Sequence, residues 1–428
     1  MSKSDKGFNR YLLLTFFIGF GFFTMGLMDI LYDTYVPIFL GNFIGKNWII
    51  GTLMTLDNIL AVFLIHFVSL WSDNARTRIG RRMPFIITML PLTALFFSLI
   101  PYAAANSLAG ILLVIFGLNL FKQAARGPVV ALMPDTIPGQ YRSEANGIIN
   151  TMGALGAIIS TVGLAKLMDL DTVLPILGRT KDTLPFPIAG MLVVLATALV
   201  FFFVRERSRE DEEKEERVPL LKALRTVAGE SDKSALWILV SLFLWFLGYQ
   251  GMLPFVGKLC KDVFGITAGS KAALPASAVA IAQLLFAIPS GYLAHRIGRR
   301  KAIRISLAVL TAILAVVAVI ASPVGEPLGA MRFNLLLGIM FVYGIFWITI
   351  ITNSFPMLWQ MASFGSIGFF TGLYYTFSQT AAISAPPITG LIIDLVGYPG
   401  IFVFASFCMF GAYLVMARVT KGEPGKGS

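Results

Sequence analysis

A short basic stretch occurs twice in this 428-residue chain, once in each half. Residues 78–82 read Arg-Ile-Gly-Arg-Arg, and residues 296–300, 218 positions later, repeat the same five amino acids. Long apolar runs flank both copies. Since a membrane-spanning segment does not tolerate so much charge, each copy is predicted to be a tight turn at a membrane surface. Matching turns at matching positions predict a chain built from two similar halves.

The composition assigns the chain to the membrane proteins that cross the bilayer many times. Hydrophobic residues make up 57% and charged residues 13%, against about 45–50% and 25% in soluble domains. A net charge of +11 would suggest nucleic acid in a soluble protein, but here Lys and Arg gather between the apolar runs, so we expect no nucleic-acid partner. Cys260 and Cys408 lie in separate predicted spans, and neither a disulfide framework, a metal site nor another cofactor is expected.

Apolar runs of about 20 residues predict an all-α membrane protein with twelve spans in two pseudo-symmetric bundles of six. We expect an N-terminal bundle over 1–204, a linker over 205–234, a C-terminal bundle over 235–420 and a disordered tail over 421–428. The predicted spans are 11–40, 48–71, 84–104, 108–133, 143–168, 185–204, 235–262, 272–294, 302–322, 333–357, 364–393 and 398–418.

The positive charges predict the orientation. Of the 34 Lys and Arg residues, 24 fall on one face, seven on the other and three inside spans. Because cytoplasmic loops carry the excess of Lys and Arg, both termini and the linker are predicted to be cytoplasmic, in a cell membrane.

Two six-helix halves with a basic turn after the second and eighth spans resemble the major facilitator superfamily. Residues 72–86, which contain the first turn, are similar to the longer turn of glycoside/pentoside/hexuronide cation symporters and of sucrose transporters. Residues 127–135 and 142–147 also resemble the sucrose-transporter pattern. The resemblance implies a monomer whose halves close alternately around a central sugar site.

The chain departs from these groups at the positions that hold the coupling ion. Melibiose-type members have an acid two residues before the fourth-span proline, where this chain has Arg126, and their second-span acids align with Ala61 and Ile65. Sucrose transporters have an Asp where this chain has Asn119. The first two departures argue against a sodium site of the melibiose type. The third means that the proton site of the sucrose-transporter type is also changed.

Ionisable side chains inside the predicted spans cluster in the first half, although each costs about 2.5 kcal/mol or more near the bilayer centre unless it is paired. The rise of a helix brings Asp29, Asp57 and Lys122 close to one layer. We expect Lys122 or Arg126 to neutralise one of these acids, and a proton or sugar hydroxyls to rearrange the pair. Static salt bridges are the alternative. The candidates for proton coupling are Asp29, Asp33, Asp57 and His66, although His66 alone is more typical of hydrogen-bonded structure.

The second half holds neutral hydrogen-bonding and aromatic side chains inside its spans instead of charges. Sugars need such partners, because hydroxyls donate and accept hydrogen bonds and the apolar ring face stacks on aromatic rings. The candidate substrate-binding residues are Asp29, Asp57, Asn58, Asn119, Lys122, Arg126, Tyr249, Gln250, Asn353, Tyr375 and Gln379.

Both basic turns are also candidates for gating. An acid beside the arginines can form ion pairs while one side of a transporter is closed. In the second copy His295 stands where an acid is expected, which predicts a weaker latch; a role in setting topology alone is the alternative. The candidate gating residues are Asp73, Arg78, Arg81, Arg82, Arg296, Arg299 and Arg300.

The sequence shows no catalytic arrangement and no phosphate-binding loop, so we expect a transporter, not an enzyme. The leading hypothesis is a secondary active importer of a disaccharide or glycoside, coupled to protons in preference to sodium. A sugar uniporter and a facilitator-type exporter of drugs or small metabolites remain alternatives. For such an exporter we expect a buried acid without the counter-charges of Lys122 and Arg126.

Overall fold

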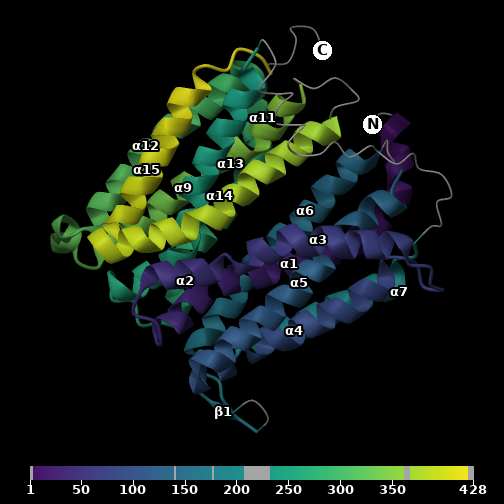
Figure 1. Cartoon of the computed structure of the whole chain (residues 1–428), viewed down its shortest axis with the longest axis horizontal. Coiled ribbons are helices and arrows are strands. Elements are labelled where there is room, and N and C mark those ends of the chain that lie inside the picture. Colours follow the sequence, from purple (N-terminus) through teal and green to yellow (C-terminus); the bar gives the residue numbers. More distant parts are fainter. Residues whose placement is uncertain (1–2, 139–140, 176–177, 207–231, 361–366, 423–428) are drawn as a thin grey trace. The chain divides into compact units, whose positions relative to one another are not determined.

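A computed structural model describes residues 3–138, 141–175, 178–206, 232–360 and 367–422 (Figure 1). Within these residues, twelve helical segments are long and apolar enough to cross a membrane. The prediction of an all-helical, twelve-span chain is therefore confirmed. The predicted ends fall within about three residues of the observed ones, apart from the start of the eleventh span. That predicted start, residue 364, lies outside the described residues, and the helix is described from Ile367 onward.

The chain divides into two compact units. Unit 1 comprises residues 1–43, 56–212 and 266–277. Inside it, α4 packs along both α5 and α7 (Figure 1). Its elements are α1 (Lys3–Gly41), α3 (Leu56–Asn74), α4 (Met83–Asn106), α5 (Leu108–Thr136), α6 (Arg142–Ile158), η2 (Ile159–Gly163), η3 (Leu164–Asp169), β1 (Val173–Leu174), β2 (Gly178–Arg179), α7 (Pro185–Phe203) and α10 (Gly269–Ala272).

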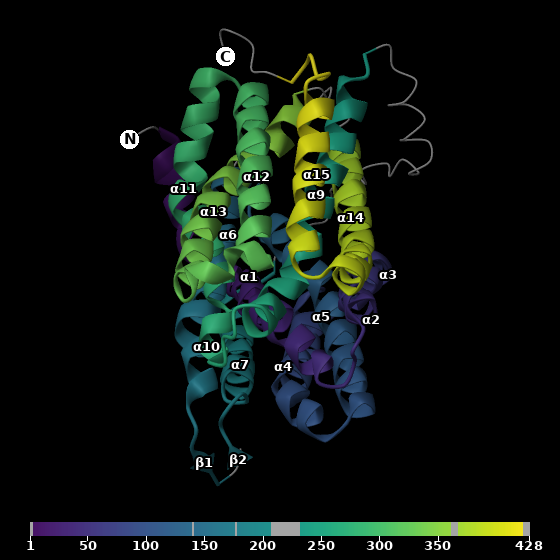
Figure 2. The same ribbon diagram turned by 90° about the vertical axis from the view of Figure 1, so that its left-hand side faces the viewer.

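Unit 2 comprises residues 44–55, 213–265 and 278–428. Inside it, α15 lies beside both α9 and α12 (Figure 2). Its elements are α2 (Asn47–Met54), α9 (Ser234–Asp262), α11 (Leu274–Ile297), which begins in unit 1, α12 (Arg299–Ala321), η4 (Pro323–Leu328), α13 (Met331–Trp359), α14 (Ile367–Val396) and α15 (Pro399–Met416).

Each unit therefore contains a short segment from the other half of the sequence. In unit 2, the carboxylate of Asp394 accepts hydrogen bonds from the backbone N–H groups of Asn47 and Trp48 at 2.9 and 3.0 Å. In unit 1, Asp169 accepts hydrogen bonds from the backbone N–H and hydroxyl of Ser270. Each carboxylate satisfies N–H groups at a helix start that have no partner within the helix.

Helices α1 and α6 approach so closely that only glycine fits between them. A Cβ atom added to Gly26 would lie 2.0 Å from the carbonyl oxygen of Gly153, and one added to Gly156 would lie 2.3 Å from that of Phe23. Small residues permit this close packing in membranes. Burial of apolar surface does not by itself favour the association of helices there, because the lipid tails are equally apolar. The contact fixes the part of α1 that precedes Asp29.

The loop between η3 and α7 forms a short hairpin, which the spans do not predict. Strands β1 and β2 pair antiparallel, and Figure 2 shows them projecting past the helices of unit 1. Arg179 binds Asp171 through two hydrogen bonds of 2.8 and 2.7 Å. These bonds lower the pKa of the Asp171 carboxyl.

Candidate functional site

The charged side chains inside unit 1 come from three helices. Asp29 and Asp33 are four residues apart on α1, so they share a face of that helix. Asp57 lies in the first turn of α3. Lys122 lies in the middle of α5.

Lys122 and Asp29 form an ion pair, with 2.6 Å between the ammonium nitrogen and a carboxylate oxygen. The Lys122 side chain is 6% exposed and the Asp29 side chain 37% exposed. The ammonium also lies 5.4 Å from the ring centre of Tyr32, within the range of a cation–π contact. Lys122 with Asp29 is thus one of the pairings that the helix depths allow.

A second polar contact lies one turn from this pair. The amide nitrogen of Asn119 donates to the hydroxyl of Tyr32 at 3.0 Å, and Asn119 is fully buried. Within the described chain, the amide oxygen of Asn119 and both amide atoms of Gln123 are buried without a hydrogen-bond partner. Such groups are costly unless water or a ligand satisfies them.

Two further acids inside unit 1, Asp57 and Asp33, interact electrostatically with the ion pair of Lys122 and Asp29. Asp57 interacts electrostatically with Lys122, Asp29 and Arg126, and its carboxylate also accepts two hydrogen bonds from Asn58, at 2.7 and 2.9 Å. Asp33 interacts with Asp29, Asp57 and Lys122. The side chain of His66 lies outside the described residues.

We define the carboxylate cluster as Asp29, Asp33 and Asp57 with the cations Lys122 and Arg126. With every group ionised, it carries three negative and two positive charges. It therefore becomes neutral when one more positive charge arrives. That charge can be a proton or a cation.

The neutral candidates of unit 2 lie in an aromatic group. The rings of Tyr249 and Trp347 stack with 4.1 Å between centres and 16° between planes. Tyr374 is buried, stacks on Phe355 at 3.8 Å and shares a hydrogen bond with Ser354. Three helices, α9, α13 and α14, thus contribute rings to this aromatic group.

The remaining candidates of unit 2 differ in their accessibility. Asn353 is 3% exposed and donates to the carbonyl of Thr349 within its own helix, so that donor is already used. Tyr375 is 56% exposed, whereas Gln250 and Gln379 are half-buried. Of the adjacent tyrosines at 374 and 375, only Tyr375 presents an accessible side chain.

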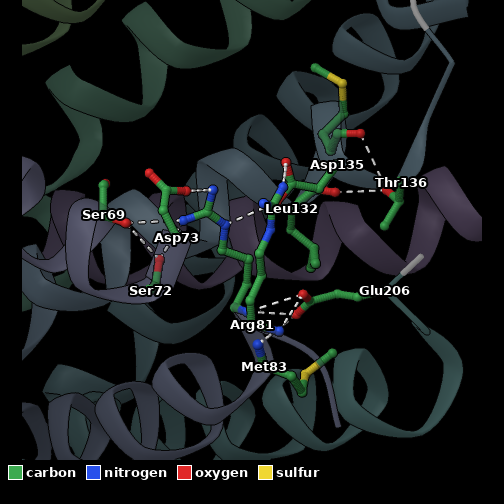
Figure 3. A network of polar contacts seen from close by, with 11 residues as sticks. Ser69, Ser72, Asp73, Arg81, Met83, Leu132, Asp135, Thr136 and Glu206 are labelled. Carbon is green, nitrogen blue, oxygen red and sulfur yellow. Dashed lines mark hydrogen bonds and ion pairs between the residues drawn. The ribbon is translucent and has the colours of Figure 1, made fainter. Parts of the chain in front are cut away.

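The first basic turn is held by a network of ion pairs in unit 1 (Figure 3). Arg82 pairs with Asp73 and, at 2.9 Å, with Asp135. Arg81 pairs with Asp135 at 2.8 Å. Among the described residues, exposed Arg78 takes no part in this network, and its gating role stays a prediction.

Sequence reasoning missed two acids of this network. Glu206 lies three residues after α7, and its carboxylate accepts hydrogen bonds from the backbone N–H groups of Arg81, Arg82 and Met83 (Figure 3). It falls within residues 205–234, which the sequence predicts to be a linker between the two bundles. Asp135 belongs to a motif used only for the resemblance. Its place on α5, two turns beyond Pro128 and one turn beyond Ala131, does not indicate that it faces the basic turn.

The second basic turn is held differently. Arg300 donates to the carbonyl oxygen of Ala417, just after α15, so a backbone group takes the place of an acid. His295 and Arg296 are exposed, and Arg299 is half-buried with interactions of its own. The arginines of this copy thus do not repeat the contacts of Arg81 and Arg82.

Twelve helical segments long and apolar enough to span a bilayer define a multi-pass membrane protein. The chain matches the model of the Major Facilitator Superfamily over residues 18–379 and again over 272–428, and it belongs to this family. No curated protein matches the sequence.

Solved structures with the same fold include several transporters at 14% sequence identity. One is a bacterial homolog of the human lysosomal transporter Spinster, inward-facing and occupied (TM-score 0.67; 98% of this chain and 95% of that chain). A mutant of the nucleoside transporter NupG has a TM-score of 0.67, with 94% and 98% covered. A bacterial homologue of the iron transporter ferroportin, inward-facing, has a TM-score of 0.68, with 95% and 99% covered. At this identity the likeness establishes the fold alone.

Proposed function

We propose that this chain is a proton-coupled sugar transporter that works by alternating access. The observation that carries the proposal is the ion pair of Lys122 and Asp29 inside the carboxylate cluster. A drug exporter of the facilitator type is expected to have a buried acid without counter-charges. The presence of Lys122 beside Asp29 favours the symporter.

Proton coupling follows from the charge balance of the cluster. Asp29, Asp33 and Asp57 exceed Lys122 and Arg126 by one charge, so uptake of one proton neutralises the group. The 37% exposure of Asp29 lets water deliver this proton, because an ionised carboxylate facing lipid would be expensive. The proton and the substrate then stabilise the same arrangement of Lys122, so that both are carried in one direction.

The sugar assignment rests on the neutral side chains and on the resemblance of the first basic turn to sugar symporters. Asn119 and Gln123 present buried amide atoms without a protein partner among the described residues, and such atoms suit hydroxyl groups. In unit 2, Gln250, Gln379 and the accessible Tyr375 offer further donors and acceptors. We also propose that the protein acts as a monomer in a cell membrane with both termini in the cytoplasm.

Uptake of labelled disaccharides and glycosides into proteoliposomes tests this function. We expect accumulation when the outside is acidified and no stimulation when a sodium gradient replaces the pH gradient. Failure to transport any glycoside would refute the sugar assignment. Sodium-driven uptake would refute the coupling assignment. Equilibration without accumulation would identify a uniporter.

A further inference from the structure

Three hydroxyl side chains follow one another along α14 at intervals of four residues. Each hydroxyl donates to the backbone carbonyl four residues earlier, at 2.9 Å for Thr376, 2.8 Å for Thr380 and 2.6 Å for Ser384. Because residues four apart lie on one face of a helix, these three side chains form a row, which we call the hydroxyl row. Thr380 is exposed, and Thr376 and Ser384 are partly exposed.

These hydrogen bonds decide what the hydroxyl row can bind. A Ser or Thr hydroxyl has one hydrogen to donate and two lone pairs that accept. Because each hydrogen is already directed to the helix backbone, the three oxygens can only accept further hydrogen bonds. A molecule that binds the hydroxyl row must therefore bring donors.

Two prolines add backbone acceptors next to the end of the row. Pro386 and Pro387 lie inside α14 and have no N–H, so the carbonyl oxygens of Ala382 and Ile383 do not receive the usual bond from four residues on. These residues lie near the middle of the spanning segment Gly372–Val396, where an unsatisfied carbonyl is costly. A helix interrupted at this depth is typical of substrate sites in transporters.

The face that carries the hydroxyl row suits water and substrate better than lipid. Among the spanning segments of the described residues, that of α14 is the least apolar. The same face carries Tyr375, which is exposed, and half-buried Gln379, and an amide that faces lipid is costly. The ring of Tyr375 lies at 62° to that of Phe355 and at 78° to that of Tyr374, so neither ring stacks on it.

The two ends of the hydroxyl row differ. A Cβ atom added to Gly372, one turn before Thr376, would meet no neighbouring helix within 4 Å. Beyond Ser384, α2 covers α14, since a Cβ atom added to Gly51 would lie 2.2 Å from the carbonyl oxygen of Pro386. The row is thus open at its first member and ends where α2 begins to cover the helix.

The spacing of the row sets the size of the molecule that can use all of it. With a rise of about 1.5 Å per residue, its first and last members lie about 12 Å apart along the helix. A single pyranose ring is shorter than this, whereas linked rings span it. Between Ile367 and Ile393 the sequence has no Asp or Glu, so this part of α14 has no carboxylate that would attract ammonium donors in place of hydroxyl donors.

We propose that the hydroxyl row selects a substrate of at least two linked sugar rings, whose free hydroxyl groups donate to Thr376, Thr380 and Ser384. This inference rests on the proposed function and names the part of the site that distinguishes an oligosaccharide from a monosaccharide. Tyr375 offers its ring face and Gln379 its amide to the same substrate.

Uptake kinetics of the full-length protein in proteoliposomes test this selection. The preferred disaccharide among sucrose, maltose and melibiose is compared with glucose and galactose. We expect the KM for each monosaccharide to be about 25-fold higher, from about fivefold for each of two lost hydrogen bonds of about 1 kcal/mol. A monosaccharide with the same KM as the preferred disaccharide would overturn the inference.

Removal of single hydroxyls tests the residues. Thr380→Val keeps the size of the side chain and should raise the KM for the preferred disaccharide about fivefold, with kcat and the melting temperature of the substrate-free protein unchanged. Thr376→Val/Thr380→Val should raise this KM about 25-fold. Thr380→Ser keeps the hydroxyl and should restore the wild-type KM. Wild-type KM values in both valine variants would contradict the role of the row.

Thr88→Val is the matched control. The Thr88 hydroxyl is exposed on α4 and donates to the carbonyl of Pro84 at 2.7 Å, as the members of the hydroxyl row do on α14, and we expect less than a twofold change in KM. An equal loss in this control would overturn the inference. Absence of uptake for every glycoside would refute the proposed function and this inference with it, whereas disaccharide uptake that the α14 variants leave unaltered would overturn this inference alone.

Discussion

The ammonium of Lys122 lies 2.6 Å from the carboxylate of Asp29 and is almost inaccessible, whereas the carboxylate remains partly exposed. Solvent therefore reaches the carboxylate of Asp29 but hardly reaches the ammonium of Lys122. A proton or a hydroxyl group can reach Asp29 without displacing Lys122 from its surroundings. The proposed function makes use of this asymmetry.

Loss of Lys122 should cost both stability and coupling. Removing one partner of a fully buried ion pair costs about 3–5 kcal/mol; for Lys122→Gln we expect roughly 2–3 kcal/mol, because water reaches Asp29. The measurement is thermal unfolding in detergent, together with pH-driven uptake. Asp29→Asn/Lys122→Gln should be more stable than Lys122→Gln and still fail to accumulate substrate. A double variant whose losses equal the sum of the single losses would argue against the pairing.

The hydroxyl of Tyr32 should matter for substrate affinity. Tyr32→Phe leaves the ring beneath Lys122 and removes the group that accepts from Asn119, so we expect the KM of uptake to rise about fivefold, from the loss of a bond of about 1 kcal/mol. Tyr35→Phe is the matched control, since the Tyr35 hydroxyl donates to Gly269 instead. The two variants should differ in KM. Equal KM values would mean that Asn119 does not bind substrate.

Glu206 should stabilise the first basic turn. Glu206→Ala leaves the backbone N–H groups of Arg81, Arg82 and Met83 without this carboxylate, and we expect a loss of about 1–3 kcal/mol in the free energy of unfolding. Hydrogen exchange of residues 78–86 provides the local measurement, with faster exchange expected there. The exposed Arg78→Ala should leave this exchange unchanged. Exchange rates that Glu206→Ala does not alter would show that the carboxylate is dispensable.

Asp394 should hold the first turn of α2. Asp394→Ala removes the acceptor for the N–H groups of Asn47 and Trp48, and the loss of a helix cap, about 1 kcal/mol, should speed hydrogen exchange in residues 47–54 about fivefold. Asp262→Ala provides a control, because Asp262 binds Lys258 and Tyr398 instead. If both variants exchange alike in α2, Asp394 is not its cap.

The twelve spans and the shared layer of Asp29 and Lys122 could be predicted, because long apolar runs and the charges within them can be read directly from the sequence. Which cation pairs with which acid could not be predicted. Helix rise alone placed these two groups in one layer. The cap formed by Glu206 could not be predicted, since it depends on where the chain turns after α7. The same holds for Asp394 and Asp169, whose partners lie 347 and 101 residues away, and for Asn353, whose side chain bends back onto its own helix.

The most direct test of the account is uptake of a transported sugar by Asp29→Asn at several imposed pH gradients. The wild type should accumulate sugar above equilibrium in proportion to the gradient. Asp29→Asn should still exchange internal for external sugar but accumulate none, because the cluster then has equal numbers of acids and cations and needs no proton. Gradient-driven accumulation by Asp29→Asn at the wild-type level would contradict the central claim.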